Sequence, residues 1–217
     1  MLEGIHKIHL IGIGGSGMRA IANILIQKGY EVSGSDVKES DVIERFRQMG
    51  ATVHIGHNAD YVQGVDAVVR STAIREDNPE IVAAKEQGIT ILHRSDIVKA
   101  VLDVTNGIAV AGAHGKTSTT SMIGQILVEG QMEPTVIIGG EVDYLKGSSC
   151  LGKGEYSVVE ADESDGSFLK LRPKTIVITN IEDDHMDHYK TMENLLNAFC
   201  QFVETLPVDG KAVVCGD

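Results

Sequence analysis

The chain has 217 residues, of which 42% are hydrophobic, and this is enough apolar content for one large or two ordinary packed domains. Its 31 acidic and 19 basic side chains leave a formal net charge of −12 without a basic cluster, so we expect no binding to nucleic acid or to an anionic membrane. Three widely spaced cysteines and the lack of a long apolar run predict a cytoplasmic protein with no disulfide framework and no membrane span.

The first half of the chain alternates short apolar strands with helices. Strands are expected at 6–13, 31–34, 52–55, 67–70 and 89–92, and helices at 18–28, 42–49, after 78–79 and at 95–102. Such alternation is typical of a parallel, doubly wound sheet that is covered on both faces. We therefore predict a Rossmann-like domain over residues 1–104.

A glycine loop follows the first of these strands. Gly12-x-Gly14-x-x-Gly17 opens the first helix, and Asp36 stands nineteen residues after the last glycine, which satisfies the dinucleotide fingerprint and by itself indicates NAD. Any ligand with a diphosphate benefits from the same close backbone approach. Asp36 could hold a ribose, bind a base edge or cap the next helix, and the glycines could serve only packing of strand against helix.

The second half repeats the alternation after a polar stretch at 103–107. Strands are expected at 108–111, 135–138, 156–161, 175–179 and 212–215, and helices at 117–128 and 192–204. We predict a P-loop-type α/β ATPase domain over residues 105–217. It is expected to be truncated, because the sequence stops just past a strand where such a domain normally continues into a helix.

A second glycine loop begins this domain, in the order strand, glycine turn, Lys-Thr and helix. That order aims backbone N–H groups and a helix N-terminus at an anion. Strict P-loop spacing requires glycine at position 110, where the chain has valine, so the match is to a shorter Gly112-x-x-Gly115-Lys116-Thr117 variant. Lys116 is expected to neutralise the β- and γ-phosphates of ATP, and the Thr117 hydroxyl to bind magnesium. The alternative is a glycine turn whose Lys-Thr pair only starts a helix. The expected ATP contacts are Gly112, Ala113, His114, Gly115, Lys116, Thr117 and Ser118.

Two acidic clusters follow later strands, at 160–165 and 182–187. Parallel strands bring their carboxyl ends to one edge, so both clusters should lie beside the second glycine loop. Carboxylate oxygens suit magnesium, and we predict Thr117, Glu160 and His185 as its ligands. His185 with His188 could instead form a transition-metal pair, such as a zinc site. Solvated loop positions or helix caps are expected for Glu163, Glu182 and Asp183.

Two phosphate-type loops in tandem favour a transferase or ligase that brings a nucleotide-linked substrate to ATP. With these motifs the chain resembles the ATP-dependent Mur ligases of bacterial cell-wall synthesis. The motifs that carry the resemblance occur in the family's order at 9–18, 34–36, 71–74, 112–117, 160–165 and 179–187.

The resemblance implies a ligase that joins L-alanine to the carboxylate of UDP-N-acetylmuramate through an acyl phosphate, with ATP and Mg²⁺. Lys116 and His185 are then the catalytic residues. The first loop would hold a UDP-sugar rather than NAD, and a third domain with amino-acid contacts would be missing. The expected UDP-sugar contacts are Gly14, Gly15, Ser16, Gly17, Met18, Asp36, Ser71 and Thr72.

Two departures from the family pattern bear on this expectation. Ala113 stands where these ligases usually have threonine, and residues 191–205 contain no lysine, although sibling ligases carry a carbamylated lysine in that helix. Cys200 lies in this region and is interpreted as a small core residue. The absence of lysine favours the alanine-adding branch or the related murein-peptide recycling ligase. A fragment that binds UDP-sugar and ATP without turnover and an NAD-dependent oxidoreductase remain alternatives, and the oligomeric state is open.

Overall fold

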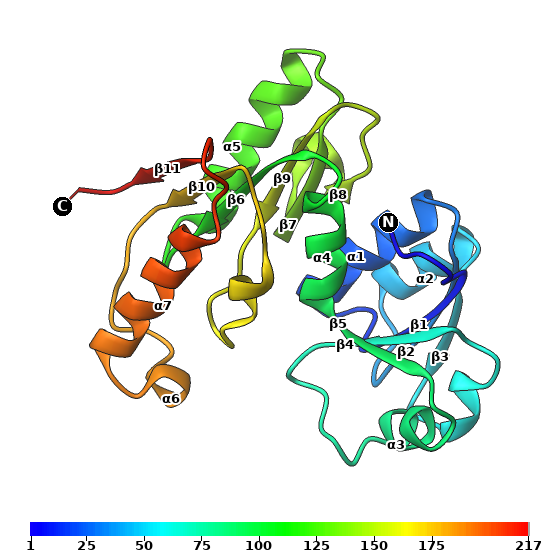
Figure 1. Ribbon diagram of the computed structural model, residues 1–217. Coiled ribbons are helices and arrows are strands. Elements are labelled where there is room, and N and C mark those ends of the chain that lie inside the picture. Colours follow the sequence, from blue (N-terminus) through cyan, green and yellow to red (C-terminus); the bar gives the residue numbers. More distant parts are fainter. Residues whose placement is uncertain (217) are drawn as a thin grey trace. The chain divides into compact units, whose positions relative to one another are not determined.

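The computed structural model describes residues 1–216, which separate by their contacts into two compact units, Met1–Ile97 and a second that begins at Val98 (Figure 1). The division falls inside helix α4 (Arg94–Leu102), before the boundary predicted after residue 104. The end of α4 packs with the second unit, since a Cβ on Gly107 would lie 2.3 Å from Leu102 Cδ2.

The first unit is built on a parallel five-stranded sheet, as predicted. Its strands, in the order β3-β2-β1-β4-β5, are β1 (Lys7–Ile11), β2 (Glu31–Asp36), β3 (Thr52–Ile55), β4 (Ala67–Arg70) and β5 (Thr90–His93). Strand order reverses between β1 and β4. Ligands of open α/β sheets bind beyond the carboxyl ends of the strands at such a reversal, and the first glycine loop follows β1.

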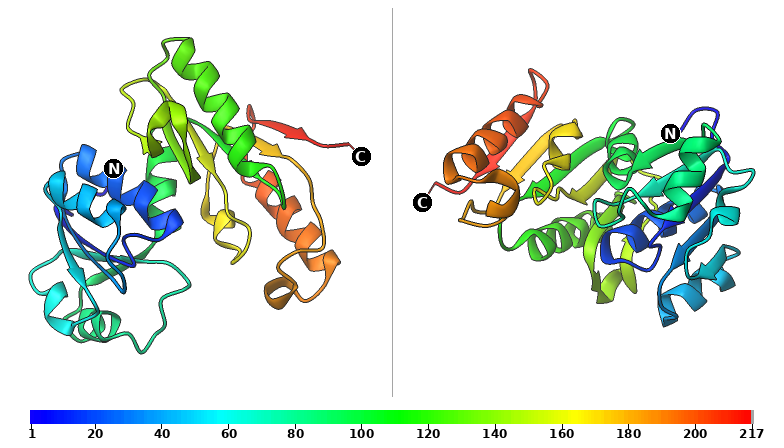
Figure 2. Two further views of the ribbon diagram at one scale, coloured as in Figure 1. Left: turned by 180° about the vertical axis from the view of Figure 1, so that it is seen from behind. Right: turned by 90° about the horizontal axis from the view of Figure 1, so that it is seen from below.

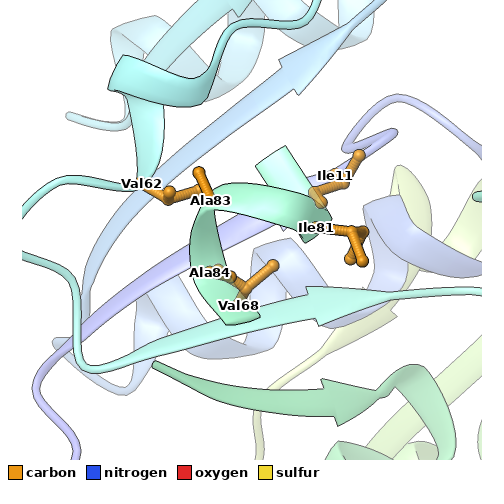
Figure 3. Close-up of a cluster of buried hydrophobic side chains, with 6 residues drawn as sticks. All are labelled: Ile11, Val62, Val68, Ile81, Ala83 and Ala84. Atoms are coloured by element: carbon orange, nitrogen blue, oxygen red, sulfur yellow. The ribbon is translucent and has the colours of Figure 1, made fainter. Parts of the chain in front are cut away.

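Helices cover both faces of this sheet. They are α1 (Ser16–Gln27), α2 (Asp41–Gln48), α3 (Pro79–Glu86) and the 3₁₀ helix η1 (Ala59–Val62). Figures 1 and 2 show α1 and α2 on one face and α3 with η1 on the other. Because side chains alternate along a strand, β1 points Ile8 and Leu10 to one face and His9 and Ile11 to the other. The buried cluster on the α3 face, drawn in Figure 3, consists of Ile11, Val62, Val68, Ile81, Ala83 and Ala84.

The second unit contains a six-stranded mixed sheet. Its strands, in the order β11-β10-β6-β9-β7-β8, are β6 (Asn106–Ala111), β7 (Thr135–Val142), β8 (Gly147–Cys150), β9 (Tyr156–Glu160), β10 (Thr175–Ile178) and β11 (Lys211–Val214). Only β8 runs antiparallel among the described strands, and the sequence analysis did not predict it. Its Gly-Ser-Ser-Cys sequence lacks the apolar alternation by which a strand is recognised.

The helices of the second unit also flank both sheet faces. They are α5 (Lys116–Glu129), α6 (Met186–Tyr189) and α7 (Met192–Glu204), with the 3₁₀ helices η2 (Asp143–Leu145) and η3 (Ser167–Lys170). α5 lies on one face and α7 on the other (Figure 2). Phe168 of η3 packs on α7, with ring centroids 4.8 Å from Phe202 and 5.3 Å from Phe199. The expected core position of Cys200 is wrong, because the buried face of α7 contains Phe199 and Phe202 and Cys200 is exposed.

Three neighbouring parallel strands place the sequence motifs of this unit together. β6 lies between β10 and β9, with Ala111 paired to Ile178 and Val110 paired to Glu160. The glycine loop after β6 and both acidic clusters therefore start at the same edge of the sheet, as predicted. A membrane-spanning helix is absent from residues 1–216, since none of their helices combines the required length with sufficient hydrophobicity.

Candidate functional site

The loop between β6 and α5 depends on two glycines. Gly112 has a φ of +132° and Gly115 a φ of +82°, values that residues with a Cβ atom rarely adopt. A Cβ on Gly112 would also lie 2.2 Å from Thr179 Oγ1. Within residues 1–216 no side chain caps α5 at Gly115, so the first turn of α5 presents its backbone N–H groups as a site for an anion.

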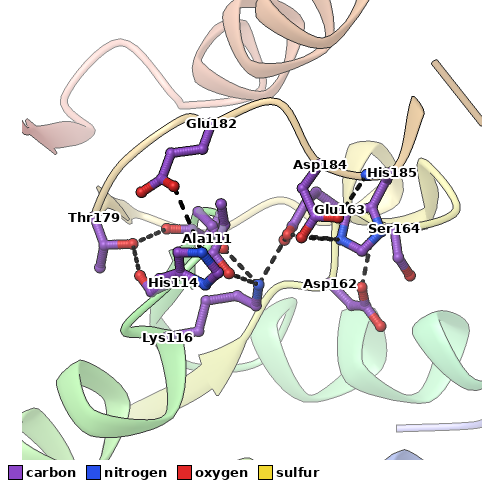
Figure 4. Close-up of polar contacts among 12 residues, drawn as sticks. Ala111, His114, Lys116, Asp162, Glu163, Ser164, Thr179, Glu182, Asp184 and His185 are labelled. Carbon is purple, nitrogen blue, oxygen red and sulfur yellow. Dashed lines mark hydrogen bonds and ion pairs between the residues drawn. The ribbon is translucent and has the colours of Figure 1, made fainter. Parts of the chain in front are cut away.

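The end of β10 holds this loop in shape. The Ala113 N–H donates to the Asn180 carbonyl oxygen at 3.2 Å, and the His114 N–H donates to Asn180 Oδ1 at 2.9 Å. In return, the Thr179 hydroxyl donates to the His114 carbonyl oxygen at 2.6 Å, as Figure 4 shows. Ala113 and His114 thus contribute backbone groups to the loop, and the side chain of His114 points into solvent at 70% exposure.

Lys116, in the first turn of α5, lies at the centre of the site. Its ammonium group donates to Glu163 Oε1 at 2.8 Å and to the carbonyl oxygens of Gly112 and Ala113 (Figure 4). The Glu163 side chain is only 2% exposed and that of Lys116 is 19% exposed. Lys116, the side chain predicted to contact phosphate, therefore lies against the backbone of the glycine loop. Its counter-ion is the buried Glu163 carboxylate.

The expected solvated position of Glu163 is wrong. Glu163 is 1% exposed, and the Tyr189 hydroxyl donates to its carbonyl oxygen at 2.5 Å, which holds this segment against α6. Burial, followed by the nearby Glu163 charge, raises the pKa of Tyr189 to about 12, so Tyr189 stays a neutral donor. Glu182 and Asp183 are exposed as expected. Only the folded chain distinguishes Glu163 from these acids, because all three stand in equally polar sequence.

His185 also contacts the Glu163 carboxylate, which Lys116 contacts as well. It adopts a left-handed conformation with φ of +57°, and its Nε2 lies 3.4 Å from Glu163 Oε1 and 3.6 Å from Asp184 Oδ2 (Figure 4). This conformation is uncommon for a non-glycine residue, and histidine is among the side chains that adopt it more readily. The fold thus brings His185 to Glu163 and Lys116.

Glu160 and Thr117 form a second pair at the end of β9. The pKa of Glu160 is raised, chiefly by burial, although a hydrogen bond to the Thr117 side chain and the charge of Lys116 oppose the shift. Glu160 Oε1 is buried and has no hydrogen-bond partner among the described residues. A buried carboxylate oxygen with free acceptor capacity beside a hydroxyl is the donor set that a magnesium ion accepts. Thr117 and Glu160 therefore fit the expected magnesium ion.

Protein side chains alone do not complete a metal site in the described part of the chain. Residues 1–216 contain no group of three or more His, Cys, Asp and Glu side chains arranged to hold a metal ion. This gives no support to a zinc site at His185 and His188. Magnesium differs, since it usually keeps water ligands and binds through one or two carboxylates together with substrate phosphates.

The first glycine loop, in the other unit, is fixed by the end of β2. The Gly12 and Ile13 N–H groups donate to the Ser35 carbonyl oxygen at 2.8 and 3.1 Å, and the Gly14 N–H donates to Asp36 Oδ2 at 2.9 Å. Gly12 has a φ of +73°. A Cβ on Gly14 would lie 3.0 Å from Asp36 Oδ2, so a side chain there would push the Asp36 carboxylate away by a few tenths of an ångström. The Asp36 side chain therefore holds the backbone of the first glycine loop in position.

The N-terminus of α1 follows this loop and has no side-chain cap at Gly15. Gly15 and Ser16 are exposed, whereas Met18 is 3% exposed and its side chain belongs to the core, so only its backbone could contribute to a ligand contact. A Cβ on Gly17 would lie 2.6 Å from Arg94 Nη1. Arg94 thus places a guanidinium beside α1. The sequence analysis missed it because an arginine at the start of a helix has no motif to mark it.

Ser71 and Thr72 follow β4, the strand next to β1. Ile74 Cδ1 lies 3.5 Å from the position that a Cβ on Gly12 would take. The segment 71–74 is therefore adjacent to the first glycine loop, at the strand-order reversal of the sheet. The fold brings all of the predicted first-site segments to one sheet edge.

Comparison with known proteins matches both units. The family model described as "Mur ligase family, catalytic domain" matches residues 7–104, and the "Mur ligase middle domain" model matches residues 110–217. UDP-N-acetylmuramate–L-alanine ligase from Desulfatibacillum aliphaticivorans is 49% identical over 212 residues, covering 98% of this chain and 46% of the relative. The corresponding ligase from Desulforamulus reducens is 51% identical over 213 residues, covering 97% and 46%.

Solved structures with the same fold carry related names. UDP-N-acetylmuramate-alanine ligase from Thermotoga maritima superposes with a TM-score of 0.89 at 33% identity, covering 97% of this chain and 49% of that one. UDP-N-acetylmuramate:L-alanyl-gamma-D-glutamyl-meso-diaminopimelate ligase from Neisseria meningitides gives a TM-score of 0.91 at 29% identity, covering 98% and 72%. The chain spans about half the length of the curated relatives it matches. Its two matched domains, joined in this order and each with its glycine loop at a sheet edge, show that the chain belongs to the Mur ligase family.

Proposed function

We propose that this chain provides the UDP-sugar-binding and ATP-binding parts of a cytoplasmic ligase that joins L-alanine to the carboxylate of UDP-N-acetylmuramate. The observation that carries the proposal is the identity of 49–51% to relatives with that name across nearly the whole chain. The contact of Lys116, at the start of the helix after a glycine loop, with the buried Glu163 carboxylate supports it independently, since a charged lysine beside such a loop suits a phosphate group.

The chemistry requires activation of a carboxylate, which is a poor electrophile. In the proposed reaction a carboxylate oxygen of the sugar attacks the γ-phosphorus of ATP and ADP leaves. The alanine amine then attacks the acyl carbon, loses a proton and expels phosphate. Charge grows on the transferring phosphoryl oxygens, so positioning and electrostatic stabilisation account for most of the catalysis in such steps.

The residues of the second unit have distinct parts in this scheme. Lys116 neutralises phosphate charge, and the N–H groups at the start of α5 bind phosphate oxygens. Thr117 and Glu160 would hold Mg²⁺, which supplies positive charge to the phosphates when bound. His185 would complete the site from the side of Glu163, as a further ligand of the ion or as a hydrogen-bond donor to the phosphoryl group.

The first unit is proposed to bind the UDP part of the sugar. The uncapped N-terminus of α1 suits the diphosphate, and the Arg94 guanidinium beside Gly17 adds a positive charge. Asp36, whose carboxylate already accepts the Gly14 N–H, borders the nucleoside position together with Ser71 and Thr72. A hydride-transfer enzyme would leave the second glycine loop without a function.

The related murein-peptide recycling ligase shares this fold but is less similar in sequence. The Neisseria meningitides structure is 29% identical to this chain, against 49% for the ligase of Desulfatibacillum aliphaticivorans. The alanine-adding reaction is therefore preferred. In the whole protein, phosphate release that depends on L-alanine would support this preference, and release that depends only on the tripeptide would reverse it.

Thermal unfolding of this chain tests the first site. UDP-N-acetylmuramate should raise the melting temperature and NAD at the same concentration should not. Ligand at about 100 times its dissociation constant stabilises the folded state by roughly 2.7 kcal/mol, which corresponds to a few degrees. Gly15→Asp should abolish the shift, because its carboxylate would face the diphosphate at the start of α1. A shift with NAD alone would overturn the assignment of this unit.

A further inference from the structure

A buried polar cluster lies under the first glycine loop, on the α3 face of the first sheet. We call it the Glu80 cluster, and it consists of Glu80, His9, Ser33, Ser35 and His57. Glu80, His9 and Ser35 are all 0% exposed. None of these residues belongs to the proposed ligand contacts. A carboxylate this deeply buried costs several kcal/mol unless it is well compensated, so its surroundings require an explanation.

Donors surround both oxygens of the Glu80 carboxylate. Oε2 accepts from the Ser35 hydroxyl at 2.7 Å and lies 3.4 Å from His9 Nε2. Oε1 accepts from the Asn58 N–H at 3.2 Å and lies 3.3 Å from His57 Nδ1. Burial alone would raise the pKa of Glu80, but the contacts with His9 and Ser35 hold it below its usual range. The side chain is therefore an ionised acceptor.

Ser35 connects this carboxylate to the loop. Its hydroxyl donates to Glu80, while its backbone carbonyl oxygen accepts both the Gly12 N–H and the Ile13 N–H at 2.8 and 3.1 Å. The next residue, Asp36, accepts the Gly14 N–H at 2.9 Å. The end of β2 thus holds three consecutive loop residues, and Glu80 holds the end of β2.

An amide could not replace this carboxylate fully. A glutamine at position 80 would direct one NH₂ group either at Ser35 and His9 or at Asn58 and His57. Turned towards Ser35 and His9, the NH₂ group would require the Ser35 hydroxyl to accept instead of donate, and turned towards Asn58 it would face the Asn58 N–H. Either orientation of the amide therefore changes the contacts that the ionised acid makes.

We propose that Glu80 is a positioning residue of the first glycine loop, acting through Ser35 to hold the loop N–H groups in the arrangement that binds a diphosphate. It touches no ligand itself. The identity of the ligand rests on the proposed function, but the effect of Glu80 on the loop does not. Loop geometry and ligand affinity can accordingly be measured separately.

The experiment compares Glu80→Gln, Ser35→Ala and the double variant with wild type. In ¹H–¹⁵N spectra of the ligand-free chain, each single variant should move the amide signals of Gly12 and Ile13 and speed their hydrogen exchange. Affinity for UDP-N-acetylmuramate, measured by calorimetry well below the melting temperature, should fall about tenfold in each single variant. The affinity of the double variant should be no lower than that of the single variant that binds more weakly, because both substitutions remove the same connection between Glu80 and the loop.

Ser33→Ala is the matched control. Ser33 contacts His9 Nδ1 at 2.9 Å but not Glu80, so its loss should leave the Gly12 and Ile13 signals and the affinity unchanged. Unmoved Gly12 and Ile13 signals in Glu80→Gln or Ser35→Ala would overturn the proposal. Fully additive affinity losses in the double variant would also overturn it. If the wild type fails to bind the UDP-sugar, the proposed function fails, while the amide signals still test the role of Glu80. Should Glu80→Gln not fold, Ser35→Ala alone tests the connection.

Discussion

Lys116 Nζ lies 2.8 Å from Glu163 Oε1, and the carboxylate of this pair is almost completely buried. The lysine predicted to meet phosphate thus carries its own counter-ion. A phosphate group must compete with Glu163 for Lys116, while removal of either partner leaves the other charge uncompensated. Three of the following predictions concern this part of the second unit.

Lys116→Ala should weaken ATP binding while UDP-N-acetylmuramate binding persists, because the two glycine loops belong to different units. We expect a loss of at least about 30-fold, or about 2 kcal/mol, which is the lower range for truncating one partner of a buried charged contact. Calorimetry with each ligand separately measures both affinities. An equal loss of both would mean that Lys116 supports the fold as a whole.

The matched control restores charge balance without restoring the lysine. Lys116→Ala leaves Glu163 buried without its counter-ion and should lower the stability of the second unit. Lys116→Ala combined with Glu163→Gln should recover the melting temperature, but its ATP affinity should stay below that of wild type. Wild-type ATP affinity in the double variant would contradict a direct role of Lys116 at the phosphates.

Glu163→Gln alone should tighten nucleotide binding. The substitution removes both a competitor for Lys116 and a negative charge that would repel phosphate, so we expect about a tenfold lower dissociation constant, or about 1.4 kcal/mol. Glu182→Gln is the control, because it makes the same charge change on an exposed side chain that is 3.6 Å from His114 instead of Lys116. Weaker binding in Glu163→Gln would show that Glu163 also orients Lys116 in the bound state.

Gly112→Ala should distort the second glycine loop. The new Cβ would lie 2.2 Å from Thr179 Oγ1 and 2.8 Å from the Asn180 carbonyl oxygen, on a backbone with φ of +132°. We expect a loss of about 2 kcal/mol or more in unfolding free energy, together with loss of ATP binding. Gly216→Ala, where a Cβ would meet nothing within 4 Å, should change neither. Normal ATP affinity in Gly112→Ala would mean that the loop adapts.

Because of Glu80, the unfolding free energy of the first unit should depend on pH in the acidic range. Its pKa lies below the ordinary value of 4.5 in the folded chain, so the unfolded chain binds a proton at higher pH than the folded one. The contribution of Glu80 is thus complete above the unfolded pKa and is lost as pH falls through the lowered folded pKa. The stability difference between wild type and Glu80→Gln should therefore shrink between about pH 5 and pH 3. Denaturant unfolding followed by circular dichroism measures it, with Glu86→Gln as the exposed control on the same helix. A constant difference would contradict the assignment.

The sequence by itself determined the architecture of both units. Apolar strands that alternate with helices are local patterns, and the glycine loops mark strand-to-helix turns, so the long helices and every described strand except β8 were predictable from nearby residues alone. Where the periodic signal was missing, prediction failed: β8 has the polar sequence Gly-Ser-Ser-Cys and pairs only because β7 offers an edge. The same local patterns indicated Lys116 and Thr117.

Only the tertiary structure decided which polar side chains act together. Glu163 and Glu182 stand in similar acidic segments, but the chain buries Glu163 against Lys116 and leaves Glu182 exposed. Arg94 lies beside Gly17, and Glu80 lies against Ser35 although 45 residues separate them in the sequence. Burial and long-range hydrogen bonds depend on how strands and loops assemble, and a local pattern does not encode these distances. The sequence therefore predicted the two glycine loops. Only the folded chain showed that Glu163, Glu80 and Arg94 lie beside them.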